Sequence, residues 1–320
     1  MTPKIRLSLG SAAVLGLKNA AVRTKTKTIF LLNSGGCVFN CGFCAQARNS
    51  TISGGDKLSR VSWPEFGVEE VLTALKNKQK KYQRICWQVV NTPGIFVRLP
   101  EMVREIKKIA GKKKIALSIR TNNLADVDAL FSAGADEIGL SIDAIDPEEF
   151  KKIKGGDGAV FKNFVLRVAD KYPGKIATHL IIGLGETEKQ AVELARELQE
   201  HKVIIALFAF TPVKGSGLEF NRPPDIHSYR RIQIALHLIR NNLAREFSFN
   251  KNGQIADFGY NKNALLAILK NSNVFETSGC SDCNRPYYNE RAGDEELYNY
   301  PQKCDGRVIE KMMEELLIKS

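Results

Sequence analysis

The chain has 320 residues, of which 43% are hydrophobic and 26% are charged. This composition is typical of a folded globular protein, and it excludes a disordered chain, a collagen-like repeat and a long coiled coil. Lysine and arginine outnumber aspartate and glutamate by 47 to 35, and the resulting net charge of +12 favours an acidic partner. The sequence contains no run of 18 apolar residues, so no membrane-spanning helix is predicted.

Residues 1–26 are predicted to form a short helical segment. Lys4 and Arg6 precede an apolar run that superficially resembles a signal peptide. Serine and glycine residues interrupt this run, so we favour an amphipathic helix with Ser8 as its N-cap.

From residue 27 to residue 247, short apolar runs alternate with helical patterns. The predicted strands are Thr28–Asn33, Arg84–Val90, Lys114–Ile119, Glu137–Ile142, Lys175–Ile182 and Val203–Phe210. The predicted helices are Pro64–Tyr82, Leu99–Ile109, Leu124–Ser132, Pro147–Asp170, Thr187–His201 and Ile226–Glu246. Strict alternation of this kind predicts an α/β fold with a parallel sheet. Periodicity does not distinguish a barrel from an open sheet, but in both the chemistry is located at the C-terminal ends of the strands.

After residue 247 the alternation stops. Residues 248–320 are predicted to form a C-terminal extension, with helices at Asn261–Leu269 and Val308–Lys319 and a cysteine-containing loop between them. Because this loop carries its own cysteines, we expect the extension to hold a site of its own.

Cys37, Cys41 and Cys44 directly follow the first predicted strand with the spacing CxxxCxxC. An odd total of seven cysteines in short clusters indicates metal binding rather than disulfides. Three thiolates can hold three irons of a 4Fe–4S cluster and leave the fourth iron open for chemistry. A zinc site would need a fourth ligand, and no other Cys or His lies near in the sequence.

With Phe43 before its last cysteine, this motif resembles that of the radical S-adenosylmethionine superfamily. The resemblance implies a partial (β/α)6 barrel of the TIM type, here with a C-terminal iron–sulfur extension. It also implies that S-adenosylmethionine binds at the open iron and is cleaved reductively to a 5′-deoxyadenosyl radical.

Residues 28–220 resemble the biotin-synthase-like branch of this superfamily. The cofactor contacts that the resemblance implies fall on Phe43, Asn91, Ser141, Asp143, Ile181, Gly183, Gly185 and Glu186. Ser141 stands where the branch usually has Asn, and the segment around Asn91 departs from the usual Gly-Gly-Glu. The Gly-Leu-Gly-Glu segment at 183–186 also fits a structural interpretation, in which a turn precedes a helix capped by Thr187.

Biotin synthases hold a second cluster inside the barrel with cysteines on strands two, three and five. Only Cys86, on the second predicted strand, matches this pattern. We therefore do not expect biotin synthase activity and interpret Cys86 as a small buried residue. His179 has the parity of an inward-facing residue on strand five, and a core histidine is favoured over a catalytic one.

A second cysteine group, Cys280, Cys283 and Cys304, lies in the C-terminal extension. It favours an auxiliary 4Fe–4S cluster with a fourth ligand other than cysteine, over structural zinc or a redox-active CxxC. The neighbouring candidates for that ligand are Ser278, Ser281, Asp282 and Arg285.

The stretch from Thr277 to Glu290 resembles the two-protein lipoyl synthases of archaea and anaerobic bacteria. The resemblance implies sulfur insertion into a protein-bound octanoyl chain, with the auxiliary cluster as sulfur donor. The implied partners are an octanoylated lipoyl domain or H-protein, a second radical protein of this kind and a low-potential electron donor such as ferredoxin. We expect a reducing cytoplasm as the location. The net charge of +12 suits an acidic carrier, and Arg285, Tyr287 and Tyr288 either line the substrate entrance or pack the loop.

Two other functions stay open. One is a radical enzyme that modifies a peptide or a tRNA and uses the second cluster as an electron conduit. The other is a cluster-binding scaffold or electron carrier without substrate chemistry. We expect no nucleic-acid partner, because no recognisable nucleic-acid module is present and the lysine runs fit solvated helix faces.

Overall fold

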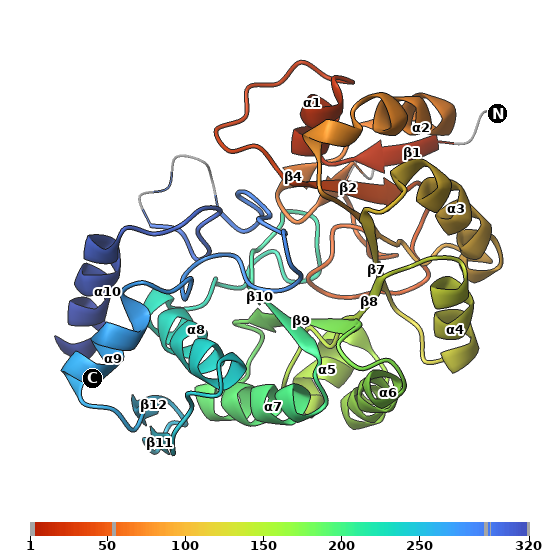
Figure 1. Cartoon of the computed structure of the whole chain (residues 1–320). Helices are drawn as coiled ribbons and strands as arrows, with labels where there is room; N and C mark the ends of the chain where they lie inside the picture. The colour runs from red at the N-terminus through yellow and green to blue at the C-terminus, as the bar shows by residue number, and fades with distance from the viewer. Residues whose placement is uncertain (1–3, 53–55, 291–293, 295, 319–320) are drawn as a thin grey trace.

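The computed structural model describes residues 4–52, 56–290, 294 and 296–318. Within these residues, one sheet contains eight strands (Figure 1). In sheet order they are β10 (Ile204–Ala209), β9 (Ile176–Ile182), β8 (Glu137–Leu140), β7 (Lys114–Ile119), β6 (Arg84–Gln88), β2 (Thr28–Asn33), β1 (Lys4–Leu7) and β5 (Glu65–Gly67). The six strands from β2 to β10 pair in parallel and follow one another in chain order. The predicted partial barrel of the TIM type is therefore confirmed.

Helices connect the parallel strands and lie along the outside of the curved sheet (Figure 1). They are α2 (Val68–Asn77), α3 (Ile95–Ala110), α4 (Leu124–Ser132), α5 (Pro147–Lys154), α6 (Gly158–Lys171), α7 (Glu188–Glu200) and α8 (Ile226–Arg240), with a 3₁₀ turn η2 at Gln79–Lys81. The prediction of one helix over 147–170 was wrong. Gly155 and Gly156 have positive φ angles of 74° and 85°, which ends α5, and Asp157 then caps α6 by accepting from the Val160 N–H at 3.0 Å.

The N-terminal segment contains a strand that the sequence pattern did not predict. β1 pairs antiparallel with β2 on one side and with β5 on the other. Ile5 and Leu7 are buried while Lys4 is exposed, as expected for an edge region of a sheet with one covered face. The predicted helix follows as α1 (Leu9–Leu15), and Ser8 Oγ caps it by accepting from the Ser11 N–H at 3.3 Å.

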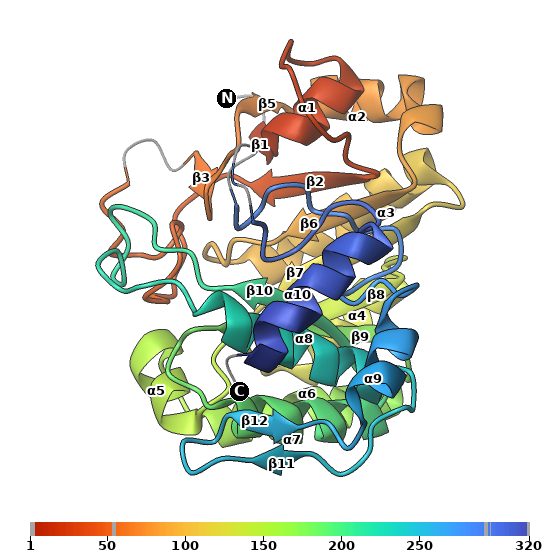
Figure 2. The same ribbon diagram turned by 90° about the vertical axis from the view of Figure 1, so that its left-hand side faces the viewer.

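The C-terminal extension begins with a hairpin, β11 (Ser248–Phe249) and β12 (Ile255–Asp257), and continues with α9 (Lys262–Leu269), which Asn261 caps. It ends in α10 (Gly306–Ile318); the predicted last helical residue, Lys319, lies outside the described residues. A short hairpin earlier in the chain, β3 (Lys57–Leu58) with β4 (Val61–Ser62), precedes β5. Figure 2 shows α10 and the blue loop in front of the gap between β2 and β10, the two ends of the parallel sheet.

Alternation along the strands divides the side chains between two environments. On β6, Ile85 and Trp87 belong to the main hydrophobic core. Cys86 and Gln88, on the other face, line a cavity inside the barrel. His179 of β9 lines the same cavity, as its parity predicts. Among the described residues, no helix has the length and hydrophobicity needed to cross a membrane.

Candidate active site

The cavity inside the barrel has a volume of about 250 Å³. Its wall combines side chains from the inner faces of the parallel strands, the loop after β2 and the C-terminal loop at 278–289. Six of the seven cysteines line it, namely Cys37, Cys41, Cys44, Cys86, Cys280 and Cys283. One cavity therefore faces both regions in which the sequence predicts cluster ligands.

The first cysteine group lies on the loop that follows β2. Gly35 begins this loop with φ of 119°, and a Cβ there would lie 2.7 Å from Thr92 Cγ2, so the backbone path needs glycine. The loop is fixed to the end of β6 because the Val38 N–H donates to the Asn91 carbonyl at 2.8 Å. Burial raises the pKa of Cys41, and it raises the pKa of Cys44 to about 12. The negative charge of thiolates at such a buried site needs a bound cation to offset it, and iron would supply that positive charge.

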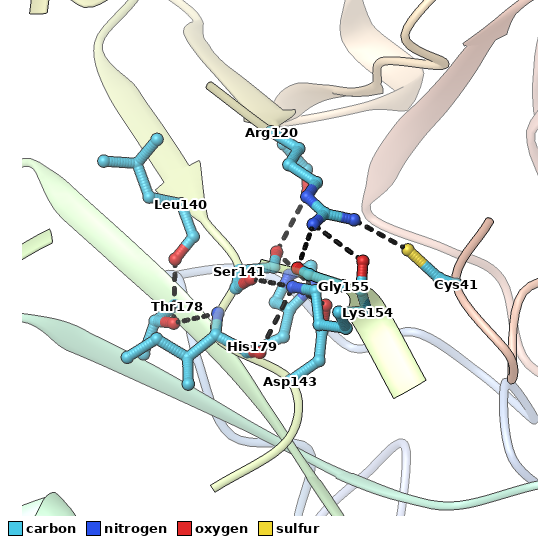
Figure 3. A network of polar contacts seen from close by, with 11 residues as sticks. Cys41, Arg120, Leu140, Ser141, Asp143, Lys154, Gly155, Thr178 and His179 are labelled. Atoms are coloured by element: carbon cyan, nitrogen blue, oxygen red, sulfur yellow. Dashed lines mark hydrogen bonds and ion pairs between the residues drawn. The ribbon is translucent and has the colours of Figure 1, made fainter. Parts of the chain in front are cut away.

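Arg120 contacts the first cysteine group directly (Figure 3). Its guanidinium donates to Cys41 Sγ at 3.2 Å and to the carbonyls of Lys154 and Gly155 at 2.8 and 3.0 Å. It also stacks on the Phe39 ring, 4.0 Å from the ring centroid. The sequence analysis did not single out Arg120. Its position directly after β7 was an available signal, because polar groups at the C-terminal ends of barrel strands gather at the active site.

The end of β8 carries a buried polar network (Figure 3). The Asp143 carboxylate forms an ion pair with Lys154 Nζ at 2.7 Å, and the ammonium also donates to the carbonyls of Ser141 and Ile142. Asp143 adopts a φ of 61°, a conformation rare outside glycine and found at functional sites. Ser141 Oγ lies 3.0 Å from His179 Nδ1. Burial lowers the pKa of His179 to about 4, so the imidazole is neutral near pH 7.

The predicted cofactor contacts divide into two sets. Phe43, Asn91, Ser141, Asp143 and Ile181 line the cavity. Gly183, Gly185 and Glu186 are not among its lining residues.

Instead, the segment at 183–186 forms a tight turn. The Glu186 carboxylate accepts from the N–H groups of Gly183 and Leu184 at 2.7 and 3.0 Å. A Cβ on Gly183 would lie 2.9 Å from Pro224 Cδ. Thr187 then forms a capping box with Gln190 at the start of α7. These contacts give the turn the structural role that the sequence left open, and a contact with the cofactor there stays a prediction.

The C-terminal loop brings Cys280 and Cys283 into the barrel. It is fixed to β10 because Ser278 Oγ accepts from the Leu207 N–H at 2.9 Å. It is fixed to β2 because Thr28 Oγ1 donates to the Asp282 carbonyl at 3.2 Å. Gly279 has φ of 119°, and a Cβ there would lie 2.8 Å from Ala206 Cβ, so only glycine allows this close approach.

Cys304 does not line this cavity with Cys280 and Cys283, and its role as a cluster ligand stays a prediction. It is buried in the hydrophobic core, and the charged groups that influence its pKa are Arg230 and Glu276. Cys86 lines the cavity with Cys280 and Cys283, so its interpretation as an ordinary buried residue is incomplete.

Of the four candidates for a fourth ligand, Ser278 and Arg285 line the cavity, whereas Ser281 and Asp282 line a separate surface pocket.

No group of three Cys, His, Asp or Glu side chains in the described part of the chain is arranged around a single metal ion. A 4Fe–4S cluster does not require its ligands to meet at a single ion, because each thiolate binds its own iron. Three thiols on one short loop, with the Arg120 guanidinium donating to a sulfur, fit such a cluster in their number and chemistry.

Comparison with known proteins agrees with this geometry. Residues 34–198 match the family model of the radical SAM superfamily. The chain belongs to this superfamily. Membership implies a 4Fe–4S cluster and S-adenosylmethionine.

Curated relatives identify the branch within the superfamily. Biotin synthase from Prochlorococcus marinus is 26% identical over 253 residues, which cover 75% of this chain and 72% of that protein. Biotin synthase from Flavobacterium johnsoniae is 25% identical over 287 residues, with 80% and 74% covered. The chain is thus a radical SAM enzyme related to biotin synthases.

Solved structures share the fold at lower identity. The FeFe-hydrogenase maturase HydG from Carboxydothermus hydrogenoformans matches with a TM-score of 0.52 and 18% identity, over 68% of this chain and 52% of that one. Methylornithine synthase matches with a TM-score of 0.50 and 17% identity, over 73% and 66%. The chain spans between about half and two thirds of these structures, and the likeness shows the barrel fold.

Proposed function

We propose that this protein is one subunit of a two-protein lipoyl synthase. It inserts sulfur into a protein-bound octanoyl chain, with a second 4Fe–4S cluster at the C-terminal loop as sulfur donor, and it works with a second radical SAM protein. The observation that carries the proposal is the shared cavity, which both Cys37, Cys41 and Cys44 and the pair Cys280 and Cys283 line. In the proposed enzyme, radical formation and sulfur delivery share this cavity.

The first cysteine group supplies the ligands of the radical-generating cluster. When bound, that cluster and S-adenosylmethionine supply the radical that removes hydrogen from an unactivated carbon. Arg120 holds Cys41 in place through its hydrogen bond to Sγ and its bonds to two carbonyls on the loop after α5. The Asp143–Lys154 pair fixes the end of β8 beside it. These contacts orient the site.

The middle of the cavity suits an alkyl chain. Aromatic and aliphatic side chains, including Phe30, Leu32, Leu58, Phe208 and Phe210, line it. His179 lies among them with its ring edge-on to Phe208, 4.9 Å between centroids, and in its neutral form it adds no charge to this apolar space. Apolar walls bind a hydrocarbon and exclude water from a reactive radical.

The net charge of +12 supports an acidic carrier as the source of the octanoyl chain. A basic surface raises the association rate of an acidic protein, and this effect falls steeply with ionic strength. We expect the rate of association with an octanoylated lipoyl domain or H-protein to fall as salt rises. A rate independent of salt would contradict this part of the proposal.

The decisive experiment compares two products in one assay. The reconstituted protein, a second radical SAM protein and a low-potential donor such as ferredoxin would be incubated anaerobically with S-adenosylmethionine and octanoylated carrier. We expect 5′-deoxyadenosine together with a sulfur-containing carrier, both measured by mass spectrometry. Cys280→Ala should retain 5′-deoxyadenosine formation on reduction and lose the sulfur-containing product. Sulfur insertion that persists in Cys280→Ala would overturn the proposal, as would a wild-type protein that produces no sulfur-containing carrier.

A further inference from the structure

Cys86 occupies a place in the barrel that the mechanism above does not use. It lies in the middle of β6, in register with Phe30 of β2 and Ala116 of β7. Its side chain is on the inner face of the sheet, lines the cavity and is partly exposed to it. A residue whose only role is core packing would face the helices, as its neighbours Ile85 and Trp87 do.

The ionisable groups around Cys86 come from the C-terminal loop and from β6. After burial, the charge of Cys283 is the largest influence that raises the pKa of Cys86, and Cys86 in turn raises the pKa of Cys280. Gln88 Nε2 donates to Cys86 Sγ at 3.1 Å. Three thiols from two distant parts of the chain thus line one cavity.

Two guanidinium groups accompany these thiols. Arg84 is fully buried on the same face of β6 and donates to Glu137 Oε2 at 2.9 Å, while its Nε has no hydrogen-bond partner among the described residues. Arg285 is held by the Ser278 carbonyl at 2.7 Å and lies 3.8 Å from the centroid of the Phe208 ring. Burial raises the pKa of Cys283, and the charges of Arg285 and Arg84 act in the opposite direction. Cationic surroundings favour thiolates, the form in which cysteine binds iron.

Cys304 has an arginine nearby, Arg230, but it does not share the cavity. It is absent from the cavity wall and belongs to the hydrophobic core that also includes Phe275 and Ile309. A buried cysteine in apolar surroundings behaves as a small hydrophobic residue.

We infer that Cys86 supplies the third thiolate of the auxiliary cluster, together with Cys280 and Cys283, and that Cys304 is not a ligand. This inference rests on the second cluster of the proposed function and specifies which residues hold it. The ligands then come from β6 and from the C-terminal loop, so cluster binding links the loop to the inner wall of the barrel. The candidate for a fourth, non-thiolate ligand is Ser278, which lines the same cavity and carries a hydroxyl oxygen.

The test isolates the second cluster in a parent variant, Cys37→Ala/Cys41→Ala/Cys44→Ala, in the full-length chain. After anaerobic reconstitution, iron and acid-labile sulfide are counted per chain, and the dithionite-reduced protein is examined by EPR. We expect about four irons in the parent. Adding Cys86→Ala or Cys280→Ala should bring iron to about zero, whereas adding Cys304→Ala should leave about four irons and an unchanged EPR spectrum.

A conservative pair controls for misfolding. Cys86→Ser keeps the size of the side chain and offers an oxygen in place of sulfur. We expect this variant to lose iron or to show an altered EPR spectrum, while its circular dichroism spectrum stays unchanged. Cys304→Ser should leave the EPR signal as in the parent. Normal iron and EPR in both Cys86 variants, or iron loss in the Cys304 variants instead, would overturn the ligand assignment alone. A parent without iron would overturn the second cluster itself, and with it the proposed function.

Discussion

The loop that carries Cys37, Cys41 and Cys44 and the loop that carries Cys280 and Cys283 reach one cavity from opposite ends of the chain. The first loop directly continues β2, and its cysteines are spaced by three and two residues. The second lies beyond the barrel, and it is held there by contacts of Ser278 with β10 and of Asp282 with β2. Local chain geometry thus builds one group, and docking of a distant segment builds the other.

In the proposed function, this difference corresponds to two separate steps that take place in one cavity. The barrel and its first loop contain what radical formation needs, and this part of the molecule matches the radical SAM family model. The second group depends on docking of the C-terminal loop against β10 and β2. Changes to the first group should therefore abolish every reaction, while changes to the second should affect only the later step.

The largest expected effect comes from Cys41→Ala. Loss of one of three ligands prevents the open-iron cluster from assembling, so reductive cleavage of S-adenosylmethionine should fall by at least roughly 1,000-fold, or about 4 kcal/mol in activation free energy. The measurement is 5′-deoxyadenosine released per chain under dithionite. Cys280→Ala is the matched control, with 5′-deoxyadenosine formation within a few-fold of wild type. Equal loss in both variants would show that the two groups do not act separately.

The next largest effect concerns the ion pair beside the second group. Arg84 and Glu137 have side chains only 2% and 7% exposed, and the charge of Cys280 acts on Arg84. Glu137→Gln leaves the buried guanidinium without its counter-charge, which should lower the free energy of unfolding by about 3–5 kcal/mol. Urea unfolding of the cluster-free protein measures this change.

The control for this prediction is Lys114→Met. Lys114 also pairs with Glu137, but its side chain is 54% exposed, so the loss should stay below about 1 kcal/mol. A large effect of Lys114→Met together with a small effect of Glu137→Gln would mean that the buried Arg84–Glu137 pair does not stabilise the fold beside Cys280.

The two cysteine-bearing loops also differ in how well their surroundings could be predicted from the sequence. The six parallel strands, β2, β6, β7, β8, β9 and β10, could be predicted because apolar runs alternate with helical patterns over the whole barrel. CxxxCxxC could be interpreted because its ligands are close in the sequence. β1 was missed, since four residues with two basic side chains do not give a clear strand pattern.

The grouping that we infer for the second site could not be predicted, for a physical reason. Its three thiols, Cys86, Cys280 and Cys283, come from β6 and from a loop 194 positions further along, as 280 minus 86 gives. Spacing in the sequence favoured Cys304, but burial in the core decides where that thiol lies. Strand parity did place Cys86 and His179 inside the barrel, yet parity does not tell which distant segment packs against them.

A smaller effect is expected at the first group from Arg120→Met. The substitution removes the hydrogen bond to Cys41 Sγ and a nearby positive charge, and both favour the reduced, more negative cluster. The reduction potential should become more negative by about 60 mV, which equals about 1.4 kcal/mol for one electron. An EPR-monitored redox titration in a Cys280→Ala background measures it for the first cluster alone. Arg120→Lys, which keeps the charge, should shift less, and an unchanged potential in Arg120→Met would argue against this contact.

The smallest effect concerns His179, which lies in the wall that both groups share. Burial holds its pKa at about 4 in the folded protein, against about 6.5 in an unfolded chain. Between these values the unfolded chain binds more protons, so the free energy of unfolding falls as pH decreases from about 6.5 towards 4. Between pH 7 and pH 5.5, the free energy of unfolding of the cluster-free wild-type protein should fall by about 1 kcal/mol because of this group. The His179→Gln variant should not show this decrease. Ser141→Ala removes the 3.0 Å contact with Nδ1 but not the burial, so it should retain the wild-type dependence. If His179→Gln followed the wild-type curve, water would have to reach the imidazole in the folded protein, and burial would no longer account for its low pKa.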